Sequence, residues 1–523
     1  MSRTGVSPDS PIGVRKTREG LTGPAAAMRI LLPLPIILPL VAAGISMCLF
    51  RRPALQRVLG AAVMVAVVVA SIVLLLQVDT HGVAVTQVGG WPAPTGITLV
   101  ADLFSAIMLV VGAVMVLVVL LYAIGQPGTS ETSPWFHPIY LVLAAGVAIC
   151  FLTGDLFNLF VAFEVMLSAS FVLITLGGTK DQVRTGMTYV VISIVASTFF
   201  LTAIGLVYAA TGTVNMADLA GRLADLPDSV RSALGLLLLV VFGVKAAIFP
   251  LFFWLPDSYP TAPTPVTAIF AGLLTKVGVY AIIRTQTLLF PDDGNGTLLL
   301  VLAGATMVVG VLGAIAQDDI KRILSFHIVS QIGYMIMGLG LFTVAGLAGA
   351  ILYTVHHIVV KTSLFLVGGL VEHLGGTGLL RRLGGMARRA PLVGALFLLP
   401  ALSLAGLPPF SGFVAKLALI QAGMAVDAWL IVGVSLVVSA LTLFSMTKIW
   451  GGVFWGAPEE PVLTAQPSEG RLRAPSLMVG ATVTLVAISL GIALAAGPAY
   501  DLSRRAAGDL MAPAVYVEAV LGS

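Results

Sequence analysis

The sequence predicts an all-α membrane protein with about fourteen transmembrane helices, arranged as two inverted five-helix repeats that each contain a broken helix. Of its 523 residues, 58% are hydrophobic and 10% are charged, whereas soluble domains carry about 25% charged residues. Apolar stretches recur along the whole chain, and two of the longest contain prolines near their centres. The 56 glycines suit the close helix packing that is found in lipid.

The candidate spans are apolar stretches, most of them close to the length of about 20 residues that a transmembrane helix needs. They are 30–50, 55–76, 97–123, 138–152, 155–177, 184–210, 231–250, 263–289, 297–315, 320–341, 345–373, 391–424, 427–452 and 475–497. As single helices at about 1.5 Å per residue, 231–289 would be about 88 Å long and 391–424 about 51 Å. Both lengths exceed the thickness of a bilayer, so we expect a break in each.

Prolines mark the two breaks. Five prolines lie between Lys245 and Lys276, and Gly406-Leu407-Pro408-Pro409 comes seven residues before Lys416. A proline lacks an N–H and clashes with the preceding turn, so it interrupts a helix. Each broken segment therefore carries an embedded lysine. The two segments are five spans apart, and an odd offset gives equivalent helices opposite orientations, as inverted repeats require.

Basic residues are distributed unevenly between alternate loops. Even-numbered loops carry Arg222 and Arg231, whereas odd-numbered loops carry fourteen basic residues: Arg51, Arg52, Arg57, Lys180, Arg184, Lys321, Arg322, Arg381, Arg382, Arg388, Arg389, Lys448, Arg471 and Arg473. Loops rich in Lys and Arg face the cytoplasm, so both termini are expected outside. Residues 1–27 are expected to be disordered. Their basic residues conflict with an outside location, which favours Met28 as the start.

Five charged residues fall well inside the predicted spans: Glu164, Lys245, Lys276, Lys361 and Lys416. A charged side chain at bilayer depth costs about 2.5–3.5 kcal/mol even on the lenient insertion scale. Broken helices at that depth are tolerated where they are buried in protein or line a wet cavity. Both observations indicate an ion path. The alternative is that the lysines lie near helix ends and extend to the interface.

Glu164 is the only acidic residue near the middle of a predicted span. A buried carboxylate needs a partner or a proton, and Lys245 is a natural partner. The alternative is a structural ion pair that only fixes helix packing, although such pairs are poor stabilisers. A buried lysine is pushed towards neutrality by desolvation and towards charge by a nearby carboxylate. A movement of Glu164 would therefore let Lys245 release or take up a proton.

The histidines extend this hypothesis. His357 and Lys361 are four residues apart and share one helix face, and a histidine titrates near neutral pH. His327 lies in SFHIVSQIGYM, whose polar residues could link it through water: Ser325, Ser330 and Gln331. The alternative, strongest for His356, is a histidine that donates to a neighbouring carbonyl.

No cofactor or metal site is predicted. The chain has no G-x-G-x-x-G after a strand, no G-x-x-x-x-G-K-[ST] and no C-x-x-C-H. Its two cysteines, Cys48 and Cys150, exclude a disulfide framework and thiolate metal binding. Any energy input must therefore come from an ion gradient or from a partner protein.

Four segments resemble a known family: LLTKVGVYAIIR, DDIKRILSFHIVSQIGYM, HHIVVKTSLFLVGG and FPLFFWLPDSYPTAPTPVTA. They are similar to the antiporter-like subunits of respiratory complex I and of Mrp-type multisubunit sodium/proton antiporters. The resemblance covers about residues 95–455. Within the family, GDLFNLFVAFEVMLSASFVLITLGG and the histidine of HIVSQIGYM most resemble the Mrp D subunit.

The resemblance implies a proton-transfer file of seven residues: Glu164, Lys245, Lys276, His327, His357, Lys361 and Lys416. Glu164 and Lys245 resemble the family's glutamate–lysine pair, and Lys276 resembles the central lysine of its eighth helix. His357 and Lys361 resemble the histidine and lysine of the eleventh helix.

Two further positions follow from the same resemblance. Lys416 resembles the lysine or glutamate of the broken twelfth helix. His327 replaces the serine or threonine that is common in complex I subunits, which favours the Mrp assignment.

As a whole, the resemblance implies a proton-translocating subunit of a sodium(cation)/proton antiporter, not an enzyme. Such a subunit works with other subunits in a hetero-oligomer, here in a bacterial cell membrane. The expected organisation is an extension at 1–27, the first three transmembrane helices at 28–136, antiporter-like repeats at 137–289 and 297–455, and a cytoplasmic loop, last transmembrane helix and tail at 456–523.

Two alternatives remain open. One is a proton-pumping membrane subunit of an NADH–quinone oxidoreductase or a membrane hydrogenase, in which electron transfer takes place in partner subunits. The other is a structural membrane scaffold whose buried charges have no role in transport; mutating the lysines would then have no effect.

Overall fold

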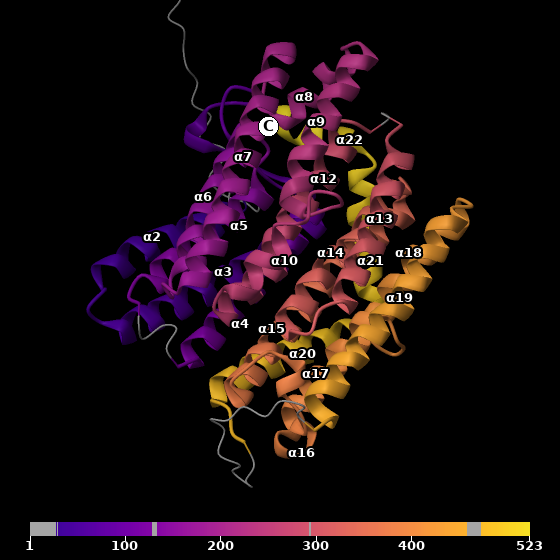
Figure 1. Cartoon of the computed structure of the whole chain (residues 1–523). Helices are drawn as coiled ribbons and strands as arrows, with labels where there is room; N and C mark the ends of the chain where they lie inside the picture. The colour runs from indigo at the N-terminus through magenta and orange to yellow at the C-terminus, as the bar shows by residue number, and fades with distance from the viewer. Residues whose placement is uncertain (1–27, 29, 128–132, 292–293, 458–471, 523) are drawn as a thin grey trace, which may run out of the picture.

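The computed structural model describes residues 28, 30–127, 133–291, 294–457 and 472–522. Residues 1–27, which were predicted to be disordered, lie outside this part of the chain, and so does the loop residue Arg471. The described residues form one helical body in which the N-terminal and C-terminal halves of the chain lie side by side (Figure 1).

Eleven helical segments of the described chain are long and apolar enough to cross a membrane. They are α3 (Pro53–His81), α4 (Leu103–Gly125), α6 (Leu156–Thr175), α7 (Lys180–Thr211), α9 (Asp228–Ala246), α11 to α12 (Thr264–Leu288), α13 (Gly296–Ile315), α14 (Ile320–Gly340), α15 (Val344–Gly375), α19 with η6 (Trp429–Trp455) and α20 (Ser476–Leu494).

Four shorter apolar helices complete the set: α2 (Leu34–Cys48), α5 (Phe136–Leu152), α17 (Pro391–Ala405) and α18 (Ser411–Ala425). When α17 and α18 are counted as two halves of one crossing, the described chain has fourteen crossings. The predicted fold class, a polytopic α-helical membrane protein, is confirmed.

The remaining elements are short. They are β1 (Ala84–Gln87), η2 (Val88–Gly90), β2 (Thr98–Ala101), α8 (Met216–Ala224), α10 (Leu255–Ser258), η3 (Tyr259–Thr261), η5 (Leu380–Arg382), α16 (Met386–Arg389), α21 (Ala496–Leu510) and α22 (Pro513–Leu521). The crossing from Thr264 to Leu288 consists of α11 (Thr264–Ile269), the π-helix η4 (Phe270–Leu274) and α12 (Thr275–Leu288).

Three helices form the buried centre. α12, α14 and α15 are buried along nearly their whole length. By contrast, α3, α7 and α20 bury only 33%, 39% and 33% of their most apolar 18 residues. The outer helices expose leucine, valine and phenylalanine, for example Val191 and Phe199 of α7, as is suited to contact with lipid. Polar side chains on the central helices are therefore enclosed by protein on all sides.

Equivalent local structures support two repeats. Asp155 caps α6 and forms an isolated β-bridge with Asn215, which follows α7. In the second half, Asp319 caps α14 and forms the same kind of bridge with Leu379, which follows α15. Moreover, α7 and α15 each have 32 residues. The boundaries of the two repeats, 137–289 and 297–455, stay predictions.

Both predicted breaks occur at a residue in the left-handed conformation. The residue that follows α9 is Ala247 (φ 59°), and the residue that follows α17 is Gly406 (φ 87°). The backbone N–H of Phe249 donates to the hydroxyl of Thr306 in α13, which satisfies one group freed by the break. The two lysines differ in position, however: Lys245 lies in the last turn before its break, whereas Lys416 follows its break, in α18.

Some boundaries differ from those predicted. The apolar stretch 97–123 does not begin as a helix, because Thr98–Ala101 pairs with Ala84–Gln87 in an antiparallel hairpin. Asp102 then caps α4, accepting a hydrogen bond from the Ser105 N–H at 2.9 Å, so the helix starts there. Hydropathy alone does not reveal this boundary, because apolar residues lie on both sides of Asp102. The C-terminal tail, for which the sequence analysis named no element, forms α21 and α22.

Candidate functional site

The seven predicted residues lie on six helices: Glu164 on α6, Lys245 on α9, Lys276 on α12, His327 on α14, His357 and Lys361 on α15, and Lys416 on α18. Six of them are buried, and Glu164 is half-buried. Buried lysines are rare in any protein unless they are paired. The structure thus distributes buried cations and imidazoles over both halves of the molecule.

Glu164 and Lys245 are joined by a serine. The Ser197 hydroxyl of α7 donates to Oε1 of Glu164 and accepts from Nζ of Lys245 at 3.3 Å. Nζ also donates to the backbone carbonyl of Ser193 at 3.4 Å. The predicted pair is therefore brought together through Ser197, and the described residues show no direct salt bridge between the carboxylate and the ammonium.

The end of α9 positions Lys245. The ammonium lies 6.0 Å from the centre of the Phe163 ring, a distance at which cation–π attraction acts. A Cβ built on Gly278 of α12 would lie 2.6 Å from the backbone nitrogen of Ala246. Only glycine allows α12 to approach the lysine-bearing turn this closely.

A small cavity lies beside Lys245. It is lined by Ser193, Tyr189 and Trp254 together with apolar side chains, and its volume is about 20 Å³. Both this volume and the about 10–15 Å³ that one water molecule needs describe the space open to the centre of a water-sized sphere. The cavity can therefore hold a water molecule next to the ammonium and Ser193.

Lys276 is held by the π-helix that precedes it. Its ammonium donates to the Ala271 carbonyl at 2.6 Å and to the Thr275 hydroxyl at 3.2 Å. Ala271 lies within η4, where the i→i+5 pattern disturbs the ordinary backbone ladder; π-helices often mark functional sites. The lysine thus rests on a backbone acceptor that this irregular turn presents.

Lys361 and His357 differ from the other members. Nζ of Lys361 and both ring nitrogens of His357 are fully buried and have no hydrogen-bond partner among the described residues. A buried polar group without a partner costs about 1–3 kcal/mol, and a charged one costs more. Their presence near the centre of α15, one of the three most buried helical segments of the described chain, indicates a role other than stability.

His327 has a partner that the sequence analysis did not name. Its Nε2 lies 2.9 Å from the Ser445 hydroxyl of α19. The predicted neighbours are engaged elsewhere: Ser325 donates to the Lys321 carbonyl and Ser330 to the Met307 carbonyl. Each serine hydroxyl can still accept a hydrogen bond, so the predicted link of His327 to these residues through water stays a prediction.

Gln331 accepts the Tyr353 hydroxyl at Oε1, whereas its Nε2, like Nδ1 of His327, has no hydrogen-bond partner among the described residues. His356, for which a carbonyl partner was considered, instead places Nδ1 2.8 Å from the Ser411 hydroxyl at the start of α18. His356 is therefore connected to the second broken helix rather than to its own helix.

Lys416 closes the second break. Its ammonium donates to the carbonyls of Leu404 and Ala405 at 3.0 and 3.2 Å and to the Ser439 hydroxyl at 3.0 Å. The last carbonyls of a helix lack intrahelical partners and carry partial negative charge. The end of α17 is thus a binding site for a cation, and Lys416 of α18 occupies it.

Two stacked tyrosines separate Lys416 from His357. The Lys416 ammonium lies 4.8 Å from the centre of the Tyr334 ring. Tyr334 stacks on Tyr353 at 5.1 Å, and the Tyr353 ring lies 6.4 Å from that of His357. The Tyr334 hydroxyl also lies 2.9 Å from the Ser439 hydroxyl that binds Lys416. An aromatic and hydroxyl layer therefore connects α15 with α18.

Ser197 was not predicted, but the repeats contain a signal for it. Counted from the start of their 32-residue helices, Ser193 and Ser197 of α7 occupy the positions of His357 and Lys361 of α15. A comparison of the two halves, residue by residue, would have marked both serines. A buried Asp102–Arg284 ion pair at the far end of α12 was also missed.

Fold and site together define a class of protein: a polytopic helical membrane protein with lysines and histidines buried across two similar halves, as in ion transporters. Residues 153–442 match the family model described as NADH:quinone oxidoreductase/Mrp antiporter, TM. The chain belongs to this family.

Two bacterial relatives share nearly the whole chain. Both are D subunits of Na(+)/H(+) antiporters. The one from Alkalihalophilus pseudofirmus is 44% identical over 497 residues, which cover 94% of this chain and 100% of the relative. The one from Bacillus subtilis is 38% identical and covers 93% and 98%. The predicted relationship to the Mrp D subunit is thereby confirmed.

Solved structures agree with the fold. A chain of the Mrp complex from a Dietzia species has a TM-score of 0.88 and 34% identity, covering 94% of this chain and 100% of that one. A chain of an archaeal membrane-bound sulfane sulfur reductase has a TM-score of 0.85 and 26% identity, with the same coverage. A chain of complex I from Thermus thermophilus, at 23% identity and a TM-score of 0.71, shares the fold.

Proposed function

We propose that this chain is the proton-carrying subunit of a multisubunit sodium(cation)/proton antiporter, with a path through Glu164, Lys245, Lys276, His327, His357, Lys361 and Lys416. Relatives of nearly full length are named as antiporter subunits, so the chain is a transporter subunit and not an enzyme. The observation that carries the proposal is the row of buried lysines and histidines on the most enclosed helices.

The first part of the path is the Glu164–Ser197–Lys245 connection. The half-buried Glu164 exchanges protons with the outside of the helix bundle, and Ser197 contacts both it and the ammonium. A hydroxyl can donate one proton while it accepts another. The small cavity on the other side of Lys245 gives room for water, through which a proton continues towards α12.

The second part crosses from α12 to α15. η4 packs against α15, where a Cβ on Gly272 would meet the Thr362 hydroxyl, one residue beyond Lys361. Lys276 on one helix and His357 with Lys361 on the other then pass the proton to His327 and Lys416. Because Lys361 and His357 have no fixed acceptors in the described chain, they are free to change partners during transfer.

The experiment that tests this proposal uses the purified complex in liposomes. Lys361→Ala is expected to abolish sodium/proton exchange, because it removes the proton carrier at the centre of the path. Lys180→Ala, which removes an exposed lysine at the start of α7, serves as the matched control. Exchange is read from a pH-sensitive dye inside the vesicles after sodium is added, and co-purification of the other subunits verifies assembly. Normal exchange by the assembled Lys361→Ala complex would refute the path.

The same proposal includes a bacterial plasma membrane location with the odd loops in the cytoplasm. On this basis Gly384→Cys, between α15 and α17, should resist an impermeant thiol reagent added to intact cells. Ala224→Cys, at the exposed end of α8 between α7 and α9, should react. Both are made in a Cys48→Ser background, because Cys48 is exposed. The reverse labelling pattern would invert the proposed orientation.

A further inference from the structure

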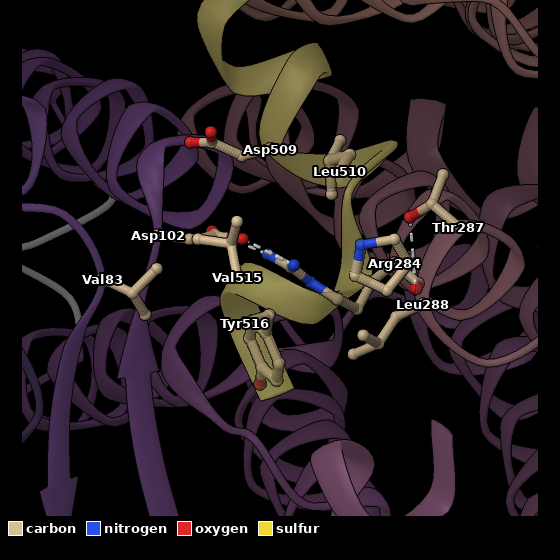
Figure 2. Close-up of a pocket in the computed structure, with 10 residues that line it drawn as sticks. Val83, Asp102, Arg284, Thr287, Leu288, Asp509, Leu510, Val515 and Tyr516 are labelled. Atoms are coloured by element: carbon tan, nitrogen blue, oxygen red, sulfur yellow. Dashed lines mark hydrogen bonds and ion pairs between the residues drawn. The ribbon is translucent and has the colours of Figure 1, made fainter. Parts of the chain in front are cut away.

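A second buried charged pair lies at the end of α12, away from the seven predicted residues. Arg284 Nη1 lies 2.6 Å from Asp102 Oδ2, and Nη2 lies 2.7 Å from Oδ1. Both residues are 4% exposed. In Figure 2 the guanidinium points directly at the carboxylate from the opposite side of the cavity. The pair therefore has the bidentate geometry that is favourable for arginine and a carboxylate.

Aromatic side chains enclose the guanidinium. Its central carbon lies 5.2 Å from the ring centre of Tyr516, 5.5 Å from that of Tyr280 and 5.8 Å from that of Phe104. The adjoining cavity has a volume of only about 10 Å³, which is at the lower limit for a single water. A hydrated ion has no space here.

The pair stands at the end of a polar row on α12. Lys276, Tyr280 and Arg284 follow at intervals of four residues and so share one helix face; Arg284 lies about 12 Å along the axis from Lys276. The Tyr280 hydroxyl accepts from Arg284 Nη2 at 3.3 Å and donates to the Phe151 carbonyl at 2.9 Å. A proton that left Lys276 along this face would pass Tyr280 and then meet Arg284.

The C-terminal helices cover the pair. Tyr516 projects from α22 onto Arg284, and Asp509 of α21 faces the same cavity (Figure 2). α22 packs against α8 and β1, while α21 packs along α15 and α4; the C-terminus lies beside α8 (Figure 1). The tail thus reaches both halves of the molecule.

We propose that the Asp102–Arg284 pair, covered by Tyr516, is an ion-tight seal that closes this end of the first repeat. A guanidinium is effectively never deprotonated in proteins, so Arg284 cannot pass on a proton that reaches it. Asp102 neutralises the guanidinium so that it can be buried. The inference rests on the proposed proton path, because a seal is needed only if Lys276 carries protons.

The charge of Asp102 is well maintained. Burial alone would raise its pKa, but Arg284 and the hydrogen bonds from Ser105 outweigh burial and keep the pKa below its ordinary value. Asp102, which lies before α4, therefore stays ionised at physiological pH. Neither member of the pair is able to release or take up a proton there, so the pair blocks transfer rather than continuing it.

The test is the passive proton leak of the assembled complex in liposomes under an imposed pH gradient without sodium. The double variant Asp102→Asn with Arg284→Gln keeps polar side chains but leaves no unpaired buried charge. It is expected to leak several-fold faster than wild type. Tyr516→Ala is expected to increase the leak rate by a smaller factor than the double variant. Tyr516→Phe, which keeps the ring, is expected to have the wild-type leak rate.

The matched control is Arg505→Gln, which breaks the exposed Arg505–Asp79 pair on the same C-terminal segment. It should leave the leak unchanged. Adding Lys276→Ala to the double variant should remove the extra leak, because the leak then loses its carrier. Wild-type leak rates in both the double variant and Tyr516→Ala would overturn the seal. A leak in Arg505→Gln as large as that of the double variant would also overturn it. So would an extra leak that persists when Lys276→Ala is added to the double variant.

The seal and the proposed path fail in different ways. If Lys276→Ala alone keeps full sodium/proton exchange, the path is wrong, whatever the leak of the other variants. If the path variants lose exchange but the double variant stays tight, the path stands and the pair has only a structural role.

Discussion

Lys245→Ala is expected to abolish sodium/proton exchange by the assembled complex. The ammonium is the only cation in contact with Ser197 in the described chain, and through this hydroxyl it is connected to Glu164. Without it the carboxylate has no onward partner, and no other lysine of the path lies on α9. Glu164→Ala should have the same effect. Exchange is measured in liposomes as the sodium-driven change in internal pH.

Ser197→Ala gives the graded test of the same connection. A hydrogen bond to a charged group contributes about 1.5–3 kcal/mol, and about 1.4 kcal/mol corresponds to a tenfold change in rate. We therefore expect a reduction of about tenfold or more rather than a complete loss. Thr198→Ala, on the exposed side of the same helix, is the control and should exchange normally. Full activity in Lys245→Ala or Glu164→Ala would exclude the pair from transport.

The second large effect is expected for Lys416→Arg. If Lys416 relays protons, its charge must come and go, and arginine is effectively never deprotonated. The substitution keeps the positive charge beside the carbonyls of Leu404 and Ala405 and near Ser439, so the end of α17 remains compensated. Proton flux through the complex should nevertheless be lost. The measurement is proton uptake by everted vesicles that contain the assembled complex.

Two further variants show whether that loss of flux reflects the fixed charge of arginine. Lys416→Glu is expected to retain some flux, because a carboxylate can also titrate. Lys448→Arg is the control: Lys448 donates to the carbonyls of Ile315 and Gln317 at the edge of the bundle, where a fixed charge suffices, so flux should be normal. Normal flux in Lys416→Arg would show that Lys416 supplies only a permanent charge and that the relay ends elsewhere.

Hydropathy and proline positions predicted most of the fold. The long apolar stretches became helices within a few residues of the predicted bounds, and the breaks fell at Ala247 and Gly406 because proline chemistry acts locally. The hairpin before α4 was missed because three of the four residues of Thr98–Ala101 are apolar and an apolar helix follows closely. The strand forms by pairing with Ala84–Gln87, and such pairing is not visible in hydropathy.

The candidate site was predicted less completely. Buried lysines are conspicuous in an apolar sequence, so Lys276 and Lys361 could be found by composition alone. The surroundings of these lysines could not be predicted. The carbonyl of Ala271 accepts from Lys276 within a π-helix, and a π-helix differs from an α-helix only in which backbone groups are hydrogen-bonded. Ser197 and Ser445 belong to other helices than the groups they contact. Serine is common in membrane helices, so only the three-dimensional arrangement distinguishes these two from the rest.

The contact of Gly278 with the end of α9 has a mechanical consequence. Because the backbones of α12 and α9 touch there, with Gly278 against Ala246, no flexible side chain lies between them to absorb a displacement. Densely packed interiors transmit strain. A shift of the turn that carries Lys245 must therefore displace the turn that carries Lys276, two residues before the glycine. The turns that carry the two lysines thus form one mechanical unit, through which a displacement at Lys245 would reach α12 by way of the backbone.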